Sequence, residues 1–511
     1  MKKIKRALIS VYDKKKLKNL LKILKKNRVQ ILSSGGTYKE IKKLGFKTIE
    51  ISNYTKSPEV LDGRVKTLNP KIHAGILMKR NNAKHKKESI KNNFQEIDLV
   101  VVNFYPFKNA SERTNNHNEI LENIDIGGPA LVRAAAKNYR DVTIISDTSQ
   151  YDEVIHHLQR NNCSTSLKLR EKLSSEAFNA TASYDSNIAN YFNNITENSF
   201  PKKKTLAFKL HEKLRYGENP HQEASVYIDG DYKLKQLNGK KLSFNNYSDI
   251  FAALRISKTL PKNKGTVIVK HANPCGVSIE TNKVDSFKLA LKSDPISAFG
   301  GIVSCNFKIN KKVAEEINKV FFEVIIADGF DKETLRIFRR KKNLRLIDSS
   351  NLKNKNLQNF KNDFNMLLLQ SSDDIKFSTK NFKIVSKIKP TRKVLNNLIF
   401  AFNICRFVKS NAIVLTHRGT TVGIGSGQPS RLDSCKIAID KLKKFNSDIN
   451  GEILAASDAF FPFVDGIETL VQSGVTAVIQ PSGSVRDKEI IKYANETGTI
   501  LVFSKSRHFN H

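Results

Sequence analysis

The sequence predicts an α/β fold with at least two domains, the first built on a doubly wound parallel sheet. Strand-like and helix-like patterns alternate through the first 150 residues, in the order typical of parallel α/β units. The chain has 511 residues, more than a single hydrophobic core usually serves. We therefore expect separate cores, each with its own sheet.

The first strand and the first helix are the clearest elements. Residues 6–11 form a short apolar run, and Leu17, Leu20, Leu21 and Leu24 follow at the spacing i, i+3, i+4 and i+7. That spacing places the four leucines on one face of an amphipathic helix. Further strands, with helical segments between them, are predicted at residues 29–32, 46–51, 97–104 and 142–145.

A polar, Asn-rich segment at residues 190–205 interrupts the α/β pattern and is typical of a linker. We therefore predict an N-terminal domain at residues 1–195 and a second region at 196–511. The second region is longer than one typical domain. We therefore predict two subdomains in it, divided by a Lys- and Asn-rich stretch at residues 340–385. The predicted strands of the second region include residues 266–269, 301–304, 412–415 and 477–479.

The composition indicates an ordinary soluble protein, with 39% hydrophobic and 27% charged residues. No apolar run approaches the roughly 18 residues of a membrane span, so we expect a cytoplasmic protein with no membrane partner. The five cysteines lie far apart without a C-x-x-C pair. This spacing disfavours a disulfide framework and a cysteine zinc site.

The formal net charge of +38 raises the question of a nucleic-acid partner. Lysines are spread along nearly every predicted helix and do not form one patch, so we expect no nucleic-acid binding. A positive field would still help the protein to capture phosphorylated substrates.

A candidate anion site follows the second predicted strand. Residues 33–37, Ser-Ser-Gly-Gly-Thr, connect that strand to a helix, and backbone N–H groups at such a junction bind phosphate. A glycine turn with a capping Thr explains the same residues. Ser10 and Lys14 favour the anion site because they follow the first strand of the sheet and would face the same crevice.

A cationic segment comes next, with Arg64 and Lys66 on one side of an extended stretch and Thr67 beside them. Two such cations alone are usually solvated surface. Asn103 and Tyr105 stand at the end of a buried strand, and their side chains could form a site together with this segment.

Three groups of the first domain could move protons, namely Tyr105, Asp125 and Lys137. Asp125 precedes a glycine turn and a helix, and Lys137 lies further along that helix. A packed tyrosine and a helix-capping aspartate are the structural alternatives.

In the second region, Lys270 and His271 lie where a buried strand gives way to a predicted Pro-Gly turn. Such a histidine can act as a general acid or base near neutral pH, and an adjacent ammonium group favours its neutral form. The string HANPC resembles part of the zinc-deaminase motif. Asn273 stands where that motif has Glu, and no second Cys follows at the required spacing, so we expect no metal site.

Two later segments could contact a flat or anionic ligand. Residues 421–431, rich in glycine and ending in Arg431, are predicted as a turn between a strand and a helix. Residues 457–463 and Asp465 form an aromatic loop suited to a ring-binding pocket, although core packing is the more frequent use of such phenylalanines.

Taken in order, these strings resemble one enzyme family from about residue 4 to the last residue. The family combines phosphoribosylaminoimidazolecarboxamide formyltransferase with inosine monophosphate (IMP) cyclohydrolase. The resemblance rests on the strings SVYDK, SSGGT, SPEVLDGRVKTLNPKIHAGIL, NFYPF, IDIGGPALVRAAAKN, LRYGENPHQ, VKHANPCGV, DPISAFGG, VKSNAIV, GIGSGQPSR, SDAFFPF and RHFNH.

The resemblance implies an N-terminal cyclohydrolase with a methylglyoxal-synthase-like fold. It implies that the nucleotide phosphate is bound by Ser10, Lys14, Ser34, Gly36 and Thr37. The residues around the closing ring would be Arg64, Lys66, Thr67, Asn103, Tyr105, Asp125 and Lys137. Lys66 is the first choice for an essential group, with Tyr105, Asp125 and Lys137 assisting proton transfer.

For the second region the resemblance implies a transformylase of two cytidine-deaminase-like subdomains without zinc, and a homodimer with its transformylase sites at the interface. Lys270 and His271 match the catalytic pair, and 10-formyltetrahydrofolate is the implied co-substrate. The implied substrate-binding residues are Arg215, Tyr216, Asn246, Asn411, Arg431, Phe463, Asp465 and Arg507.

Two places depart from the family pattern. Tyr12, Lys15 and Lys16 stand where small residues are usual, and Asn69 and Ala74 replace a common His and Gly. These departures concern details of the cyclohydrolase pocket and remove none of the proposed catalytic groups.

Overall fold

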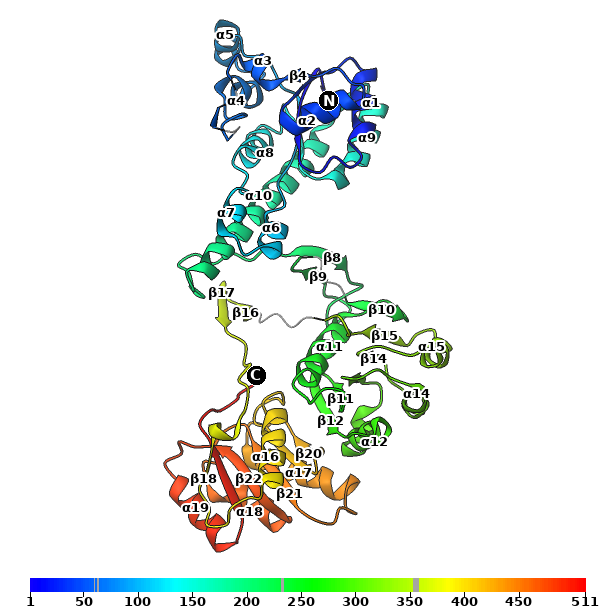
Figure 1. Cartoon of the computed structure of the whole chain (residues 1–511), viewed down its shortest axis with the longest axis vertical. Helices are drawn as coiled ribbons and strands as arrows, with labels where there is room; N and C mark the ends of the chain where they lie inside the picture. The colour runs from blue at the N-terminus through cyan, green and yellow to red at the C-terminus, as the bar shows by residue number, and fades with distance from the viewer. Residues whose placement is uncertain (59, 62–63, 231–233, 353–357) are drawn as a thin grey trace. The chain divides into compact units, whose positions relative to one another are not determined.

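The computed structural model describes residues 1–58, 60–61, 64–230, 234–352 and 358–511. Asp62 and Gly63, directly before Arg64 of the cationic segment, lie outside these residues, as does part of the 340–385 stretch. The chain forms two compact units, the first comprising chiefly Met1–Lys209 and the second beginning at Leu210 (Figure 1). Helix α10, Leu167–Ile195, is the last helix of the first unit.

The first unit is built on a five-stranded parallel sheet in the order β4-β3-β2-β5-β6, which confirms the predicted doubly wound sheet. Ala7, Leu8 and Ile9 are consecutive in β2 and all fully buried, because helices cover both faces of the sheet. The strands are β2 (Arg6–Val11), β3 (Gln30–Ser33), β4 (Ile49–Glu50), β5 (Leu99–Asn103) and β6 (Thr143–Ile145), and a separate pair comprises β1 (Lys2–Lys3) and β7 (Ser164–Thr165).

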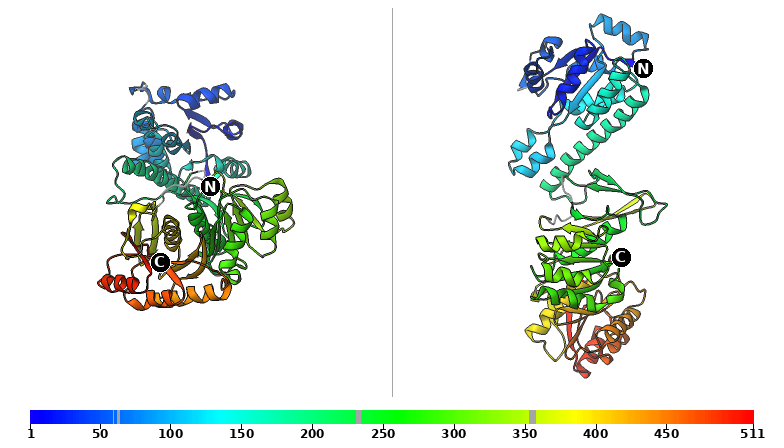
Figure 2. Two further views of the ribbon diagram at one scale, coloured as in Figure 1. Left: turned by 60° about the horizontal axis from the view of Figure 1, so that its bottom comes forward. Right: turned by 90° about the vertical axis from the view of Figure 1, so that its right-hand side faces the viewer.

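The helices of the first unit include the predicted leucine-faced helix, α1, whose four leucines are fully buried. Figure 2 shows the long helix α10 from two further sides. The helices are α1 (Leu17–Lys26), α2 (Gly35–Lys43), α3 (Ile51–Thr55), α4 (Pro70–Leu77), α5 (Ala83–Lys91), α6 (Phe107–Arg113), α7 (His117–Leu121), α8 (Gly127–Lys137), α9 (Tyr151–Arg160) and α10.

Two predicted boundaries in this unit are wrong. The strand expected at residues 46–51 is reduced to Ile49–Glu50, because only these two residues pair with β3 at the edge of the sheet. The linker expected from residue 190 begins later, since α10 continues to Ile195. Tyr191 holds this last part of the helix by packing against Phe107, with ring centroids 5.5 Å apart.

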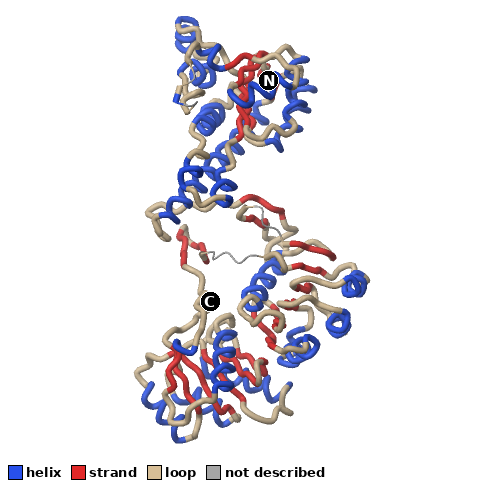
Figure 3. The backbone as a smooth tube through the Cα atoms, in the orientation of Figure 1, coloured by secondary structure: helices blue, strands red, loops and turns tan. Residues whose placement is uncertain are grey.

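The second unit contains a twelve-stranded mixed sheet made of two halves with the same strand arrangement (Figure 3). Each half begins with a hairpin, and a third strand pairs antiparallel with the hairpin. Two further strands follow, each parallel to the strand before it, and the edge strand is antiparallel to the last of them. The first half runs β12-β11-β13-β14-β15-β10 and the second β20-β19-β21-β22-β23-β18, and the two meet where Ser278 of β12 pairs with Thr420 of β20.

The order of elements along the chain is also duplicated. The first half comprises β10 (Lys235–Asn238), α11 (Phe244–Ser257), β11 (Gly265–Lys270), β12 (Asn273–Ile279), α12 (Lys283–Ser293), α13 (Pro295–Ala298), β13 (Ile302–Cys305), α14 (Lys311–Asn318), β14 (Val324–Ala327), α15 (Lys332–Arg339) and β15 (Arg345–Asp348). The second half comprises β18 (Phe382–Ile384), α16 (Arg392–Cys405), β19 (Ile413–His417), β20 (Thr420–Gly425), α17 (Arg431–Phe445), β21 (Ile453–Ser457), α18 (Val464–Gln472), β22 (Val475–Pro481), α19 (Asp487–Glu496) and β23 (Ile500–Ser504). Among the described elements of the two halves, only α13 has no counterpart.

Successive strand residues point to opposite faces of this sheet and enter different cores. Val267 and Val269 join a core that α11 and α16 share, while Ile268 joins the core of α12, α14 and α15. On the second half, Val414 joins the shared core and Ile413 the core of α17, α18 and α19. The shared core therefore binds the two halves together.

Two small hairpins complete the second unit. β8 (Lys209–Lys213) pairs with β9 (Ser225–Ile228), and β16 (Asn359–Asp363) pairs with β17 (Met366–Gln370). The β16–β17 hairpin exposes large apolar side chains, among them Phe364 and Leu368, which are 84% and 69% exposed.

Candidate active sites

In the first unit, three parallel strands bring predicted residues to one edge of the sheet. Val11 of β2 lies opposite Asn103 of β5, and Ile9 lies opposite Ser33 of β3. The carboxyl ends of β2, β3 and β5 therefore coincide, which places Ser10, Ser34 and Asn103 at this edge.

Asn103 and Thr37 hold the loop that follows β2. The side-chain oxygen of Asn103 accepts hydrogen bonds from the backbone N–H groups of Tyr12 (2.7 Å) and Asp13 (2.9 Å). The hydroxyl of Thr37 accepts from the N–H of Val11 (2.9 Å) and donates to its carbonyl (3.0 Å). These two side chains thus fix the position of the loop that carries Lys14.

The ammonium group of Lys66 lies next to Gly35, the first residue of α2, in the predicted phosphate-binding segment. Lys66 lines a cavity of about 270 Å³ together with Ser34 and Asn69. A Cβ atom placed on Gly35 would lie 2.8 Å from the ammonium nitrogen of Lys66, and Gly35 has a left-handed backbone with φ +50°. Glycine is therefore required here for both the turn and the close approach of the ammonium group.

Asp125 and Thr67 meet at the start of α8. Thr67 contacts Gly127 so closely that a Cβ there would overlap its hydroxyl. The Asp125 carboxylate accepts a hydrogen bond from the N–H of Gly128 (2.7 Å), and its own N–H donates to the Tyr184 hydroxyl (2.7 Å). Burial raises the pKa of Asp125, although the Gly128 N–H partly opposes this. The raised pKa favours proton exchange closer to neutral pH.

Two predicted residues of this unit lie apart from the group. Arg64 forms an exposed ion pair with Glu122. Lys137 is the last residue of α8, so about 15 Å of helix, at 1.5 Å per residue, separates it from Gly127 at the other end. Of the residues predicted around the closing ring, Asn103 therefore lies at the edge of the sheet, and Lys66, Thr67 and Asp125 lie at the starts of α2 and α8.

In the second unit, Lys270 and His271 lie at the tip of the β11–β12 hairpin. The expected Pro-Gly turn is wrong, because Pro274 and Gly276 belong to β12, where a bulge accommodates the proline. The turn consists of His271 and Ala272, both with left-handed backbones (φ 51° and 58°). The imidazole of His271 is exposed at this turn.

Three contacts hold this turn in place. The Lys270 ammonium donates to the carbonyl of Phe299 (2.6 Å), and the N–H of Ala272 donates to the carboxylate of Asp249 (2.7 Å). Burial raises the pKa of Asp249. From the second half of the unit, the N–H of Lys409 donates to the side-chain oxygen of Asn273 (3.1 Å).

Asn411, two residues after Lys409, is joined to Arg431. Its side-chain oxygen accepts from the Arg431 guanidinium (2.7 Å), which also donates to Ser457 (2.8 Å) and forms a buried ion pair with Asp458. The contact of Lys409 with Asn273 thus brings this cluster next to the turn that carries His271.

The first half of the glycine-rich segment before Arg431 is a strand, and only residues 426–430 form the predicted turn between strand and helix. Residues up to Gly425 belong to β20, and Gly423 and Gly425 face backbone carbonyls of α17. A Cβ at either position would overlap Ala438 or Ser434. These glycines therefore serve close packing of helix on strand, not approach to a ligand.

Comparisons with known proteins agree with this arrangement. The model of the family described as "AICARFT/IMPCHase bienzyme" matches residues 135–441, and that of the "MGS-like domain" matches residues 16–130. The chain belongs to the AICARFT/IMPCHase bienzyme family. Proteins named "Bifunctional purine biosynthesis protein PurH" are similar to it: one from Leptospira biflexa is 44% identical over 99% of both chains, and one from Lactobacillus acidophilus is 42% identical over 99% of this chain and all of its own.

As a member of the AICARFT/IMPCHase family, the chain is a bifunctional enzyme of purine biosynthesis, with formyltransferase and IMP cyclohydrolase activities. Formyl transfer in this family implies a folate co-substrate. In the parts of the chain that the structure describes, no helix is both long and apolar enough to cross a membrane. The same parts contain no group of three or more His, Cys, Asp or Glu side chains that could hold a metal ion.

The remaining residues implied by the family resemblance have varied surroundings. Asn246 is buried, where its side-chain oxygen accepts the N–H of Ser243, the N-cap of α11, and its amide donates to Glu323 (2.9 Å). Arg215 lies over the ring of Tyr216, Arg486 over Phe463, and Arg507 over Phe509, at 5.5, 4.7 and 4.7 Å from the ring centroids. Asp465, in the first turn of α18, is exposed.

Sequence reasoning missed three residues beside Lys270 and His271. Phe299 and Phe321 are more than half exposed and in contact, with ring centroids 5.4 Å apart, next to the carbonyl that Lys270 contacts. The string DPISAFGG pointed to this place without assigning a residue. Asp249 lies on α11, and its contact with the turn could not be inferred from spacing.

Proposed function

We propose that residues 1–195 perform ring closure and residues 196–511 perform formyl transfer. The observation that carries this proposal is that each compact unit gathers its own group of proton-moving side chains. Lys66 and Asp125 lie in the first unit, and Lys270 and His271 in the second. Each half would then supply one of the two activities.

For formyl transfer we propose 10-formyltetrahydrofolate as donor and 5-amino-1-(5-phosphoribosyl)imidazole-4-carboxamide as acceptor. The acceptor amine is a poor nucleophile, so His271 takes its proton as the nitrogen attacks the formyl carbon. The ammonium of Lys270, held by the Phe299 carbonyl, either stabilises the oxyanion or protonates the leaving folate nitrogen. The products are the formylated ribotide and tetrahydrofolate.

For ring closure, the carboxamide nitrogen attacks the formyl carbon and water is then lost. Positioning supplies much of the rate, since both reacting groups belong to one molecule. Lys66 would stabilise the negative oxygen, and Asp125, whose pKa burial raises, is suited to exchange a proton. Tyr105 and Lys137 complete the proposed proton-transfer group.

The proposed binding residues follow the same division. In the first unit the phosphate would be held by Ser10, Lys14, Ser34, Gly36 and Thr37, and the ring would be surrounded by Arg64, Thr67 and Asn103. In the second unit the ribotide and the folate would be held by Arg215, Tyr216, Asn246, Asn411, Arg431, Phe463, Asp465 and Arg507. No metal is part of this proposal.

We further propose a cytoplasmic homodimer with transformylase sites at the subunit interface. The β16–β17 hairpin supports the dimer, because Phe364 and Leu368 expose apolar surface that a second copy would cover. Lys361, in β16 of this hairpin, donates to the carbonyl of His511, the last residue of the sequence.

The test uses the purified full chain, both ribotides and 10-formyltetrahydrofolate. Formation of tetrahydrofolate measures the first step, and the absorbance change of ring closure measures the second. We expect His271→Ala to abolish formyl transfer while the supplied formylated ribotide is still cyclised. Full formyl transfer by His271→Ala would show that the base is assigned wrongly.

A further inference from the structure

The duplicated fold of the second unit contains a counterpart of the His271 turn. Arg418 begins the β19–β20 turn as His271 begins the β11–β12 turn, and both have left-handed backbones (φ 46° and 51°). The helices that precede the hairpins also correspond. Asp249 is the sixth residue of α11, and Asn397 is the sixth residue of α16.

The residues before the two turns make equivalent contacts. Lys270 donates to the carbonyl of Phe299, which precedes β13. His417 lies with its Nδ1 2.9 Å from the carbonyl of Glu452, which directly precedes β21. The two places are therefore built alike, although their side chains differ.

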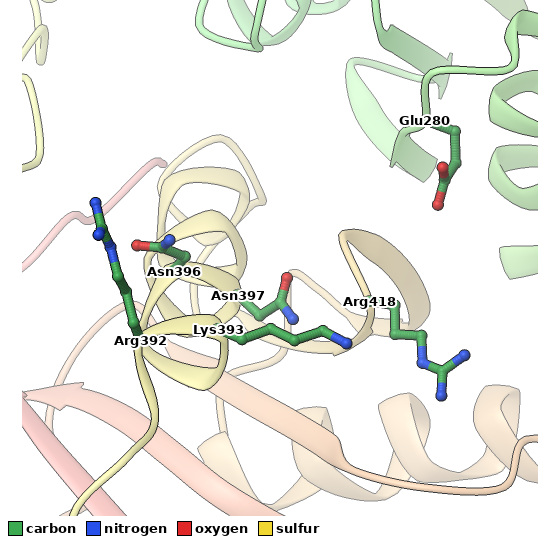
Figure 4. A pocket seen from close by; sticks show the side chains of 6 residues that line it. All are labelled: Glu280, Arg392, Lys393, Asn396, Asn397 and Arg418. Atoms are coloured by element: carbon green, nitrogen blue, oxygen red, sulfur yellow. The ribbon is translucent and has the colours of Figure 1, made fainter.

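At the second place the structure has an open pocket of about 600 Å³. Figure 4 shows Lys393 and Asn397 extending from α16 toward Arg418, with Glu280, just after β12, on the other side. The lining residues are Glu280, Arg392, Lys393, Asn396, Asn397 and Arg418.

The charges of this pocket favour an anion. The side chains of Arg392, Lys393 and Arg418 make no hydrogen bond or ion pair with any residue that the structure describes. Glu280 is the single carboxylate among the lining residues, so one negative charge accompanies three positive charges around the pocket. A bound anion would compensate the excess positive charge.

The same comparison argues against a second reaction centre. Arg418 stands where the first site has His271, and neutral Asn397 stands where it has Asp249. An arginine remains protonated and cannot serve as a general base. The pocket is therefore more positive than its counterpart and lacks the imidazole that would take a proton.

We propose that this pocket is a second ligand site of the chain and binds a phosphomonoester. Guanidinium groups bind phosphate through paired hydrogen bonds, which Arg418 can supply, and the Lys393 ammonium extends toward Arg418 from the other wall (Figure 4). The amides of Asn396 and Asn397 can donate to and accept from a polar ring. The pocket's volume lies in the range of small-molecule sites, roughly 300–1,000 Å³. The inference rests on the duplication and the charges, not on the role of His271.

The test is calorimetric titration of the full chain with inosine monophosphate, which counts the sites per chain. Arg418→Glu and Lys393→Glu reverse a charge on two different walls of the pocket. Arg339→Glu is the matched control, because Arg339 is also an exposed arginine of this unit, at the end of α15. We expect Arg418→Glu and Lys393→Glu each to weaken one binding equivalent about tenfold or more, and Arg339→Glu to weaken none.

Parallel titrations with inosine and inorganic phosphate identify the source of the phosphate. A higher affinity for inosine monophosphate than for inorganic phosphate identifies a nucleotide site. Equal affinities for the two identify a site for free phosphate, and either result supports the proposal. Equal binding of inosine and inosine monophosphate at the lost equivalent would overturn the proposal. So would unchanged titrations for both pocket variants, or an equal loss in Arg339→Glu.

Discussion

The side-chain oxygen of Asn273 accepts a hydrogen bond of 3.1 Å from the backbone N–H of Lys409, which joins the two halves of the second unit. Asn273 follows the turn of His271, and Lys409 lies two residues before Asn411. The proposed base and the cluster of Asn411 and Arg431 therefore hold their relative positions through this contact. A site built in this way needs both halves of the duplicated fold.

Lys66→Ala should stop ring closure and leave formyl transfer intact, because Lys66 lies at the start of α2 in the first unit. Lys137→Ala is the comparison, since Lys137 ends α8 at the opposite end from Gly127. We expect a loss of about 10²-fold or more in the cyclisation kcat for Lys66→Ala, and a smaller loss for Lys137→Ala. Equal losses of kcat in the two variants would contradict the lesser role that the position of Lys137 at the far end of α8 predicts.

Asp249 should act as a positioning residue for His271, because it accepts the N–H of Ala272 within the strained turn. Asp249→Ala should lower the kcat of formyl transfer by about 10-fold to 100-fold with little change in KM, as expected when a remote change misplaces a catalytic group. Asp249→Asn keeps an acceptor and should recover most of the loss.

Ser248→Ala, one residue earlier on α11, is the control for the Asp249 variants. Steady-state kinetics of all three variants and their melting temperatures separate misplacement from unfolding. An Asp249→Ala enzyme with the wild-type kcat would refute the positioning role while leaving the proposed function intact.

Asp125→Asn should raise the melting temperature at pH 7. Burial raises the pKa of Asp125 above its value of 3.8 in the unfolded chain, so its charged form destabilises the folded state. The wild type recovers this stability as the pH falls through the raised pKa. The advantage of Asp125→Asn should therefore disappear near pH 3.8.

Asp141→Asn, in the same unit, should change the melting temperature in the opposite direction. Burial alone would raise the pKa of Asp141, but Lys2 (2.7 Å) and the N–H of Arg80 (3.1 Å) together lower it. Asp141→Asn should reduce the melting temperature at pH 7, and the difference should vanish as the pH falls through the lowered pKa. Melting curves of Asp125→Asn and Asp141→Asn from pH 7 to pH 3 check the expected gain and the expected loss of stability.

Gly425→Ala should destabilise the second unit, because its Cβ would overlap the backbone carbonyl of Ser434 in α17. Such overpacking costs about 1–3 kcal/mol or more. Gly36→Ala has open space around it and should stabilise α2 by about 0.5–1 kcal/mol. If the start of α2 binds the phosphate, Gly36→Ala should also raise the KM for ring closure; an unchanged KM would argue against that role.

Leu368→Asp should shift the protein toward monomers if the β16–β17 hairpin forms the dimer interface. Leu368 is 69% exposed, so the substitution costs the isolated subunit little. Sedimentation of the wild type and of Leu368→Asp checks this, with Ile90→Asp, an 83% exposed residue of the first unit, as control. A stable dimer in Leu368→Asp would place the interface elsewhere.

The sequence alone determines the elements that local patterns specify. The leucine spacing of α1 and the consecutive buried residues of β2 predict a helix and a central parallel strand, because periodicity directly reflects which faces are covered. The strings around Lys66, His271 and Arg431 likewise indicate the family over the whole chain. These features need only neighbouring residues to be recognised.

Only the tertiary structure decides which distant residues meet. The duplication of the second unit is invisible as a repeat of residues, since His271 corresponds to Arg418 and Asp249 to Asn397. Whether a glycine serves a ligand or a packed helix, as at Gly425, depends on atoms brought near by folding. The physical reason is that turns, close approaches and charge clusters are set by contacts between segments far apart in the chain, which no local pattern records.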